Sequence, residues 1–358
     1  MDSLNPDLHW LAFPESTRLS APVRLDLPAN PCHWLELQFQ QRPTFSNYKG
    51  MRRYAPLIPF ADPEKWLGLG EPCTPVEQSV FFGHPLQLKL DFLMPTGSYK
   101  DRGTAGLMQH VQSVQPKLLL QDSSGNAGIS VAAYSARIGI PCRIFVPADL
   151  SPSKRKQLKS YGAEIEFVNG NREDVTQALL SQADQGYLAS HVWNPLFLHG
   201  TKTFLWELLD QVELGQATWP DEILFPVGNG TLLLGCYLAL KEMEGARCLP
   251  SPVRLSAAQT DVCAPLLFGQ PVHSGSSLAP GIAIGNPPRM KQIKAAVNET
   301  GGRIVSVSEP DILAAGTALF KQGWYTEFTS AVALAAWKSS GCPSNTLIPL
   351  TGTGLKNP

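Results

Sequence analysis

Lys100 is the residue of this chain whose setting points most directly to chemistry. It lies in Pro95-Thr96-Gly97-Ser98-Tyr99-Lys100-Asp101-Arg102-Gly103, where an apolar run gives way to a turn of small residues and then to a helical pattern. A lysine attacks a carbonyl group as the neutral amine, so burial or a nearby cation must lower its pKa from the usual value of about 10.4. A surface lysine at the start of a helix is the alternative interpretation, and three further segments decide between the two.

The segment Gly228-Asn229-Gly230-Thr231 stands between an apolar run that predicts a strand and another that predicts a helix. Glycines at such a place expose backbone N–H groups, and the N-terminus of a helix adds partial positive charge, which together suit a phosphate monoester. The segment is neither a Walker sequence nor GxGxxG, so it does not predict a nucleotide site. An ordinary tight turn is the alternative.

The segment Ser123-Ser124-Gly125-Asn126 follows a short apolar run and opens a predicted helix. Its hydroxyl, amide and free N–H groups could receive the α-carboxylate of an amino acid, and Asn126 could bind a phenolic oxygen on a cofactor ring. N-capping of the helix by Ser124 or Asn126 is the alternative.

The segment Thr351-Gly352-Thr353-Gly354 ends the last predicted strand. A threonine hydroxyl can bind a pyridine nitrogen without protonating it, which leaves the ring a milder electron sink, suited to elimination and replacement more than to transamination. A glycine-rich terminal loop is the alternative. Together with Lys100, the three segments predict a site for pyridoxal 5'-phosphate.

Short apolar runs typical of strands alternate with helical patterns along most of the chain, which favours parallel sheets covered by helices on both faces. We therefore expect an α/β protein of two three-layer domains with mainly parallel sheets. Ligands bind beyond the carboxyl ends of such strands, so the cofactor is expected in the cleft between the domains. The expected divisions are an irregular N-terminal arm over 1–60 and a larger cofactor-binding domain over 61–95 and 200–358. A smaller mobile domain over 96–199 carries the segment 123–126, which we call the carboxylate loop.

Bulk properties exclude several other classes of protein. The 358 residues carry a formal net charge of −1, which gives no electrostatic reason to expect nucleic acid or a membrane surface as a partner. The seven cysteines include no CxxC pair, so we expect no metal site and no disulfide framework, and a cytoplasmic protein fits best. The N-terminus lacks the pattern of a secretory signal. The uncharged run 223–240 is long enough to span a membrane, but Pro226 and two glycines interrupt it.

The four segments, in this order, resemble those of the fold-type II pyridoxal phosphate enzymes, and most of all those of the threonine synthases. The resemblance covers about Arg53 to Asn357. Pro95–Gly103 is similar to the threonine synthase lysine motif, with Tyr99 where phenylalanine is usual. Further similar segments are Gly70–Pro75, with Pro72 in a glycine position, Asn194–Thr203, Gly281–Pro287, Glu327–Ala331, and Thr351–Lys356, with Thr353 in a histidine position.

The resemblance implies a role for each matching residue. Lys100 would form the Schiff base with the cofactor and carry protons during catalysis. Asn126 would contact the 3-hydroxyl group of the cofactor ring, and Thr351 would face its pyridine nitrogen. The cofactor phosphate would bind Gly228, Asn229, Gly230 and Thr231, and the substrate would bind Ser98, Ser123, Ser124, Gly125 and Asn126.

Several departures from the family pattern concern the substrate. Phe197, His199 and Thr201 stand where threonine synthases usually have arginine, glutamate and glutamine. A phosphorylated substrate needs cationic partners at its distal end. The candidates are Lys154, Lys202 and Arg289, the last at a place where the family normally lacks a basic residue. A structural salt bridge is the alternative for each.

The resemblance therefore implies a pyridoxal phosphate-dependent lyase of threonine synthase type, which converts O-phospho-L-homoserine and water to L-threonine and phosphate. The alternative is β-elimination or β-replacement on a serine-, threonine- or phosphoserine-like amino acid, as in dehydratases and in cysteine or cysteate synthases. A catalytically silent protein that binds the cofactor is a third, less favoured alternative. The expected partners are an amino-acid substrate and, as in relatives, a second copy of the chain in a homodimer.

Overall fold

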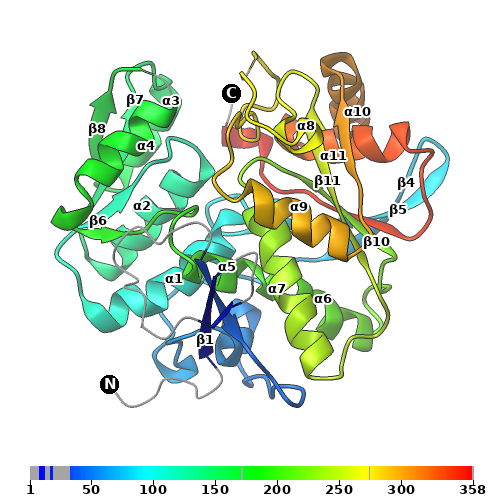
Figure 1. Cartoon of the computed structure of the whole chain (residues 1–358), viewed down its shortest axis with the longest axis horizontal. Coiled ribbons are helices and arrows are strands. Elements are labelled where there is room, and N and C mark those ends of the chain that lie inside the picture. The colour runs from blue at the N-terminus through cyan, green and yellow to red at the C-terminus, as the bar shows by residue number, and fades with distance from the viewer. Residues whose placement is uncertain (1–7, 13–16, 19–32, 171, 274, 357–358) are drawn as a thin grey trace. The chain divides into compact units, whose positions relative to one another are not determined.

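The computed structural model describes residues 8–12, 17–18, 33–170, 172–273 and 275–356 (Figure 1). The chain divides into two compact units. Unit 1 consists of residues 1–73, 100–203 and 245–247, and unit 2 of residues 74–99, 204–244 and 248–358. Lys100 is thus the first residue of the long segment of unit 1, and Tyr99 is the last residue of the first segment of unit 2.

Unit 1 is built on a four-stranded parallel sheet with the strand order β8-β7-β6-β9. Residues of β7 such as Ile144 and Val146 pack with Ile129 and Val131 of the helix that follows β6. The strands are β6 (Leu119–Gln121), β7 (Cys142–Pro147), β8 (Glu164–Val168) and β9 (Tyr187–Leu188). The helices are α1 (Lys100–Val114), α2 (Asn126–Ile138), α3 (Pro152–Ser160), α4 (Arg172–Ser181), η4 (Ala183–Gln185) and α5 (Leu196–Thr201).

The N-terminal part of unit 1 contains regular structure where the sequence predicts an irregular arm. Strands β1 (Leu8–Ala12), β2 (Thr17–Arg18) and β3 (His33–Leu37) form a small antiparallel sheet in which Leu8 is opposite Leu37. Two short 3-10 helices follow, η1 (Gly50–Leu57) and η2 (Pro63–Lys65). The strands escape sequence analysis because they have only two to five residues each, which leaves little local periodicity.

Unit 2 is built on a six-stranded sheet with the order β12-β11-β10-β13-β5-β4, parallel except for the pair β4 and β5. That pair is a hairpin whose turn, Phe82-Gly83, has positive φ at both residues (53° and 82°), as a type I′ turn requires. The strands are β4 (Val76–Phe81), β5 (His84–Lys89), β10 (Glu222–Pro226), β11 (Arg254–Thr260), β12 (Ile304–Val307) and β13 (Thr346–Pro349).

Helices cover the sheet of unit 2, and α11 (Phe328–Ser339) contributes most to its core. This helix is apolar all round and buried from Ser330 to Trp337, as expected for a helix inside a protein. The others are η3 (Asp91–Leu93), α6 (Thr203–Glu213), α7 (Thr231–Gly245), α8 (Pro265–Phe268), α9 (Met290–Glu299), α10 (Glu309–Lys321) and η5 (Gly354–Lys356). In the described ranges, no helix has the length and apolar character needed to cross a bilayer.

The topology places the predicted segments at the carboxyl ends of neighbouring parallel strands. In unit 2, β10, β13 and β5 are adjacent, and they lead into the glycine segment 228–231, the terminal segment 351–354 and the lysine turn. In unit 1, β6 and β9 are adjacent, and they lead into Ser123–Asn126 and into a segment that contains His191. These are the edges at which α/β sheets bind ligands.

Candidate active site

The residue before Lys100 is held by two of the other predicted segments. The Tyr99 hydroxyl lies 3.1 Å from Thr231 Oγ1, and the Tyr99 N–H donates to the carbonyl oxygen of Thr351 at 3.0 Å. Consecutive Cα atoms are about 3.8 Å apart. The Lys100 backbone therefore begins beside a residue that is tied to both the glycine segment and the terminal segment.

The lysine turn is fastened to the terminal segment along its length. Ser98 forms an isolated antiparallel bridge with Gly352, and Thr353 N–H donates to the carbonyl oxygen of Gly97 at 2.9 Å. The Ser98 side chain is fully buried, and its hydroxyl has no hydrogen-bond partner among the described residues. Because a buried unsatisfied hydroxyl costs about 1–3 kcal/mol, this group fits contact with a bound ligand.

The glycine segment 228–231 has the shape of an anion cradle. A Cβ atom on Gly228 would lie 2.8 Å from the Cα of Ile282, and one on Gly230 would lie 2.5 Å from the Ile293 side chain. Gly230 also has a φ of +70°, which side-chain-bearing residues rarely adopt. Only glycine fits at these positions, and a glycine turn at the N-terminus of a helix such as α7 favours an anion such as a phosphate.

Thr351 lies buried after β13, and Ser330 of α11 holds its backbone. Its N–H donates to Ser330 Oγ at 2.9 Å, and the two hydroxyl oxygens are 3.3 Å apart. Ser330 belongs to Glu327–Ala331, so two of the predicted family segments meet here. A short neutral hydroxyl at this place suits contact with an uncharged ring nitrogen.

In unit 1, the carboxylate loop forms the turn that leads into α2. Ser123 Oγ accepts from Gly125 N–H at 3.3 Å, and Gly125 precedes the helix without a side-chain cap. Asn126 is the first helical residue and is half-buried, as is Ser124. The first N–H groups of α2 are thus not capped by the side chain of the N-cap residue, in line with the predicted carboxylate site.

The first turn of α1, which presents Lys100, is anchored to α2. Ser130 Oγ donates to Asp101 Oδ1 at 2.6 Å and lies 2.8 Å from Thr104 Oγ1. All three side chains are fully buried. The first turn of α1, which carries the half-buried Lys100, is therefore fixed.

Two further residues lie by this turn, and the sequence analysis did not select either as a site residue. The Phe197 ring packs on Gly103 so closely that a Cβ atom there would be 2.2 Å from the ring. The His191 ring lies edge-on to Phe197, with centroids 5.9 Å apart. Burial, and then the charge of Lys100, lower the pKa of His191 well below its usual value, so its imidazole is neutral. Phe197 stood out in the sequence only as a departure from the family pattern, and His191 carried no signal.

The three cations proposed for a distal phosphate lie in different settings. Lys202 is fully buried, and its Nζ donates to His199 Nδ1 at 2.9 Å, while His199 Nε2 donates to the carbonyl oxygen of Leu35 at 2.9 Å. Arg289 is buried, and its Nη1 donates to Gln292 Oε1 at 3.1 Å. Lys154 is half-buried on α3. Lys202 and Arg289 thus have protein partners inside their own units.

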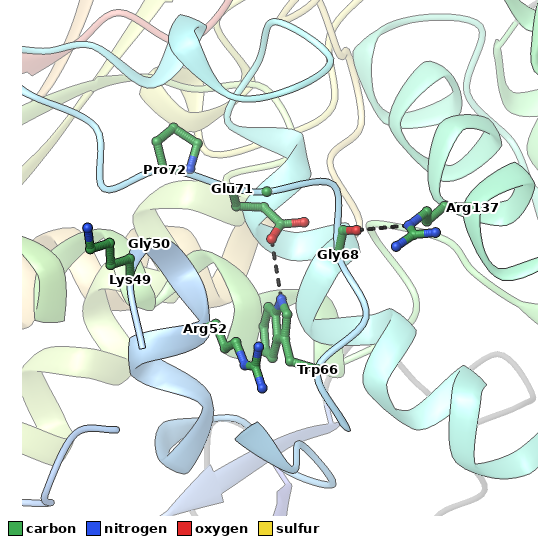
Figure 2. Close-up of a pocket in the computed structure, with 9 residues that line it drawn as sticks. Lys49, Gly50, Arg52, Trp66, Gly68, Glu71, Pro72 and Arg137 are labelled. Carbon is green, nitrogen blue, oxygen red and sulfur yellow. Dashed lines mark hydrogen bonds between the residues drawn. The ribbon is translucent and has the colours of Figure 1, made fainter. Parts of the chain in front are cut away.

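The predicted segment Gly70–Pro75 is held by its own side chains. The buried Glu71 carboxylate accepts from Trp66 Nε1 at 3.3 Å (Figure 2). It also accepts from Leu69 N–H at 2.8 Å and from the Tyr134 hydroxyl of α2. Glu71 therefore fixes one end of this segment to α2 in unit 1.

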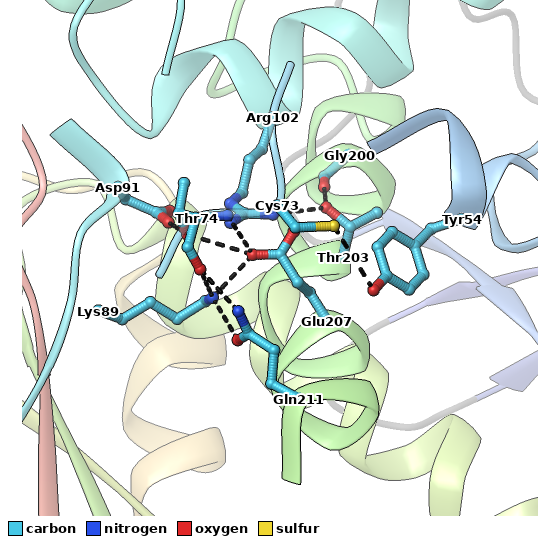
Figure 3. A network of polar contacts seen from close by, with 10 residues as sticks. All are labelled: Tyr54, Cys73, Thr74, Lys89, Asp91, Arg102, Gly200, Thr203, Glu207 and Gln211. Carbon is cyan, nitrogen blue, oxygen red and sulfur yellow. Dashed lines mark hydrogen bonds and ion pairs between the residues drawn. The ribbon is translucent and has the colours of Figure 1, made fainter. Parts of the chain in front are cut away.

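The other end of that segment belongs to unit 2 and is held by a buried charge network (Figure 3). Lys89 Nζ donates to Glu207 Oε1 at 2.7 Å and to the carbonyl oxygen of Thr74 at 2.9 Å, and both charged side chains are fully buried. Thr74 Oγ1 in turn donates to Asp91 Oδ1 at 2.7 Å, and Gln211 also contacts Lys89. Asp91 opens η3, just before the lysine turn, so the network fixes the backbone that leads to Lys100.

A family model described as pyridoxal-phosphate dependent enzyme matches residues 68–352. This range contains nearly the whole of the site described above. The chain belongs to this family of enzymes, and its cofactor is pyridoxal 5'-phosphate. The prediction of the cofactor is thus confirmed. The glycine cradle, the buried hydroxyls of Ser98 and Thr351, and the lysine all fit that group.

Several curated relatives are threonine synthases. One from Synechocystis sp. is 30% identical over 362 residues, which cover 96% of this chain and 89% of the relative. One from Bacillus sp. (strain ULM1) is 30% identical over 87% of this chain and 91% of the relative. One from Mycobacterium tuberculosis is 30% identical over 77% of this chain and 78% of the relative. The predicted resemblance to threonine synthases is confirmed.

Solved structures of related enzymes share the fold. A threonine deaminase from T.th. matches with a TM-score of 0.66 and 26% identity, over 78% of this chain and 92% of the deaminase chain. Maize serine racemase matches with a TM-score of 0.67 and 22% identity, over 79% of this chain and 88% of the racemase chain. These matches confirm the predicted fold-type II α/β class with mainly parallel sheets.

Proposed function

We propose that the chain is a lyase of the threonine synthase type, which converts O-phospho-L-homoserine and water to L-threonine and phosphate. The observation that carries the proposal is the position of Tyr99, the residue before Lys100, which contacts both Thr231 and Thr351. Threonine synthase relatives that are 30% identical over most of the chain support this reaction type.

In the proposed function each residue has a distinct task. The cofactor supplies an electron sink that makes the α-hydrogen of the amino acid acidic. Lys100 would bind the cofactor through its amine, and would then move protons between substrate carbons. N–H groups of Gly228 to Thr231 would hold the cofactor phosphate, and Thr351 would hydrogen-bond the ring nitrogen. Ser98 and the loop Ser123 to Asn126 would bind the substrate.

A second function is favoured by the side chains beside the first turn of α1. The neutral imidazole of His191 and the ring of Phe197 offer no positive charge to a distal phosphate. Lys202, one of the cations considered for that phosphate, is already engaged with His199. These observations support β-elimination or β-replacement on an unphosphorylated serine- or threonine-like substrate, with the same cofactor and the same lysine.

The experiment that separates the two is a substrate panel. The purified enzyme, loaded with cofactor, is incubated separately with O-phosphohomoserine, O-phosphoserine, serine and threonine, and the products are identified. Threonine and phosphate from O-phosphohomoserine would support the first function. A ketoacid from serine or threonine, with O-phosphohomoserine unchanged, would reject it in favour of the second. No spectral change of the cofactor with any amino acid would reject both.

A further inference from the structure

Unit 1 contains a pocket that none of the proposed catalytic steps uses. It has a volume of about 380 Å³ and is lined by Lys49, Arg52, Trp66, Gly68, Glu71 and Arg137, with neighbouring backbone (Figure 2). Arg137 lies in the last turn of α2, whereas Asn126 begins that helix. At 1.5 Å per residue, the two positions are about 17 Å apart along the helix axis. The pocket therefore lies apart from the carboxylate loop, within the same unit.

Three of the lining side chains are cations that form no ion pair within the described part of the chain. Lys49 is exposed. Arg52 donates from Nε to the carbonyl oxygen of Pro63 at 2.5 Å, and its guanidinium lies 3.3 Å from the centre of the Tyr48 ring. Arg137 is exposed, and its Nε donates to the carbonyl oxygen of Gly68 at 3.4 Å. Both arginines thus keep their terminal nitrogens for another acceptor.

The lining contains a single carboxylate, and it is occupied by neutral donors. Glu71 accepts from Trp66 Nε1, Leu69 N–H and the Tyr134 hydroxyl, and it is 4% exposed. Glu64, outside the lining, accepts from the Tyr48 hydroxyl at 2.6 Å. The lining therefore carries three cationic side chains and one carboxylate, and that carboxylate is hydrogen-bonded to neutral donors instead of pairing with a cation.

We propose that this pocket binds a small molecule with two or more anionic groups, of the phosphate or carboxylate class. Arginine forms paired hydrogen bonds with either group, and two arginines with a lysine match more than one negative charge. In Figure 2, Arg52 and Arg137 lie on different sides of the loop that carries Gly68 and Glu71. The partly buried indole of Trp66 forms an apolar wall.

The pocket is connected to the carboxylate loop by one rigid element. Arg137 and Tyr134 lie near the C-terminal end of α2, and Tyr134 is bonded to Glu71 of the pocket. The opposite end of α2 begins at Asn126, next to Ser123 and Ser124. A ligand that shifts Arg137, and α2 with it, therefore moves the carboxylate loop at the other end of the helix. This second part, which rests on the proposed function, predicts that the bound anion alters amino-acid affinity.

Binding is tested by calorimetry on the cofactor-loaded enzyme at about 0.15 M salt, with pyrophosphate and with citrate as separate probes, because the salt removes weak surface attraction. Saturable binding of either probe to one site per chain is expected, and the pair of probes separates phosphate from carboxylate preference. The variant Arg52→Gln/Arg137→Gln is expected to bind at least about tenfold more weakly, since each charged hydrogen bond contributes about 1.5–3 kcal/mol.

The matched control is Lys65→Gln, which removes one positive charge from a neighbouring exposed residue that is outside the lining and pairs with Asp62. This variant should bind as the wild type does. The visible cofactor spectrum of each variant confirms that it is folded, and Arg137→Gln alone serves if the double variant is not. Absence of saturable binding with both probes, or equal loss in Lys65→Gln, would overturn the proposed site.

The second part is measured by titrating the enzyme with the amino acid that the substrate panel identifies, with and without saturating probe. The half-saturation concentration is expected to shift by about twofold or more in the wild type and to stay constant in Arg52→Gln/Arg137→Gln. An unchanged value in the wild type would overturn the coupling. The calorimetric result needs no turnover, so it stands or fails independently of the proposed reaction.

Discussion

At the scale of single residues, Lys100 is the side chain on which the proposed chemistry depends. Lys100→Ala removes the amine that we propose binds the cofactor and moves the protons. We expect loss of the visible band of the lysine-bound cofactor and a fall in kcat of about 10³-fold or more. Absorbance spectra and product formation measure the two effects.

The control for that variant is Tyr99→Phe. It removes the hydroxyl that contacts Thr231 but keeps the ring, and phenylalanine is the usual residue of the resembling family at this position. We expect activity within a few-fold of the wild type, because one neutral hydrogen bond contributes only about 0.5–1.5 kcal/mol. Wild-type turnover in Lys100→Ala would contradict the assigned role of the lysine.

Phe197 is an uncharged side chain beside the first turn of α1, at a position where threonine synthases usually have arginine. Its substitution therefore tests the choice between the two functions. Phe197→Arg is expected to raise kcat/KM for O-phosphohomoserine relative to that for serine by about 10–100-fold, the effect of one charge-assisted hydrogen bond of about 1.5–3 kcal/mol. Phe197→Leu, which stays apolar, controls for lost packing on Gly103. Equal substrate ratios in the two variants would show that Phe197 does not contact the distal end of the substrate.

The candidate site residues that sequence analysis selects are those that stand in a local pattern. Lys100 and Gly228 to Thr231 stand in short segments whose turn and helix signals need no knowledge of distant residues. His191 is different, because a single histidine after a two-residue strand has no pattern of its own. Lys202 was selected for its charge, and only the fold shows that its ammonium is buried against His199. Burial and long-range partners are what the local sequence does not contain.

At the scale of elements, the buried pair Lys89 and Glu207 joins β5 to α6 and supports the backbone before the lysine turn. Removing one partner leaves an uncompensated buried charge, which costs about 3–5 kcal/mol. We expect Lys89→Met to lower the free energy of unfolding by that amount, and Lys89→Met/Glu207→Leu to recover part of it. Urea unfolding of the cofactor-loaded enzyme measures both.

The exposed pair Lys65 and Asp62 supplies the comparison for this prediction. Its atoms are 3.5 Å apart, with side chains 79% and 45% exposed. Lys65→Gln should therefore change stability by less than about 1 kcal/mol. If the losses of the single variants Lys89→Met and Glu207→Leu simply added in the double variant, the two buried charges would not be coupled, and the proposed support would be wrong.

The order of helices and parallel strands was predictable because short apolar runs, typical of buried strands, alternate along the chain with segments of helical periodicity. The hairpin of β4 and β5 was not, because its turn places Phe82 at positive φ, where glycine or asparagine is the usual signal. The small sheet of β1, β2 and β3 was missed because its strands have only two to five residues each.

At the scale of the whole molecule, neither unit contains all of the predicted site residues. Lys100, Asn126 and the carboxylate loop belong to unit 1, whereas the glycine segment and Thr351 belong to unit 2. The chain passes from unit 2 to unit 1 between Tyr99 and Lys100, so the lysine proposed as catalytic follows directly on a residue fixed at the glycine segment. We infer that full activity requires the intact chain.

Buried histidines make the stability of the molecule depend on pH. Burial, and then the charge of Lys202, lower the pKa of His199 well below its usual value of about 6.5. Above that value His199 is neutral in both the folded and the unfolded chain, and its full contribution to stability is present. Below it, the unfolded chain takes up a proton that the folded chain does not, so stability falls as the pH drops further. His191 is lowered in the same direction.

We therefore expect the thermal unfolding midpoint to decrease as the pH is lowered from 7 to 5. Thermal denaturation followed by circular dichroism measures it. His199→Gln can still donate to the carbonyl oxygen of Leu35 and accept from Lys202, but it does not titrate. Its midpoint should be slightly lower at pH 7 and should fall less towards pH 5, with the remaining slope due to His191 and the carboxylates. If wild type and His199→Gln lost stability in parallel over this range, His199 would not be the titrating group, and its neutral, buried state would not contribute to the pH dependence.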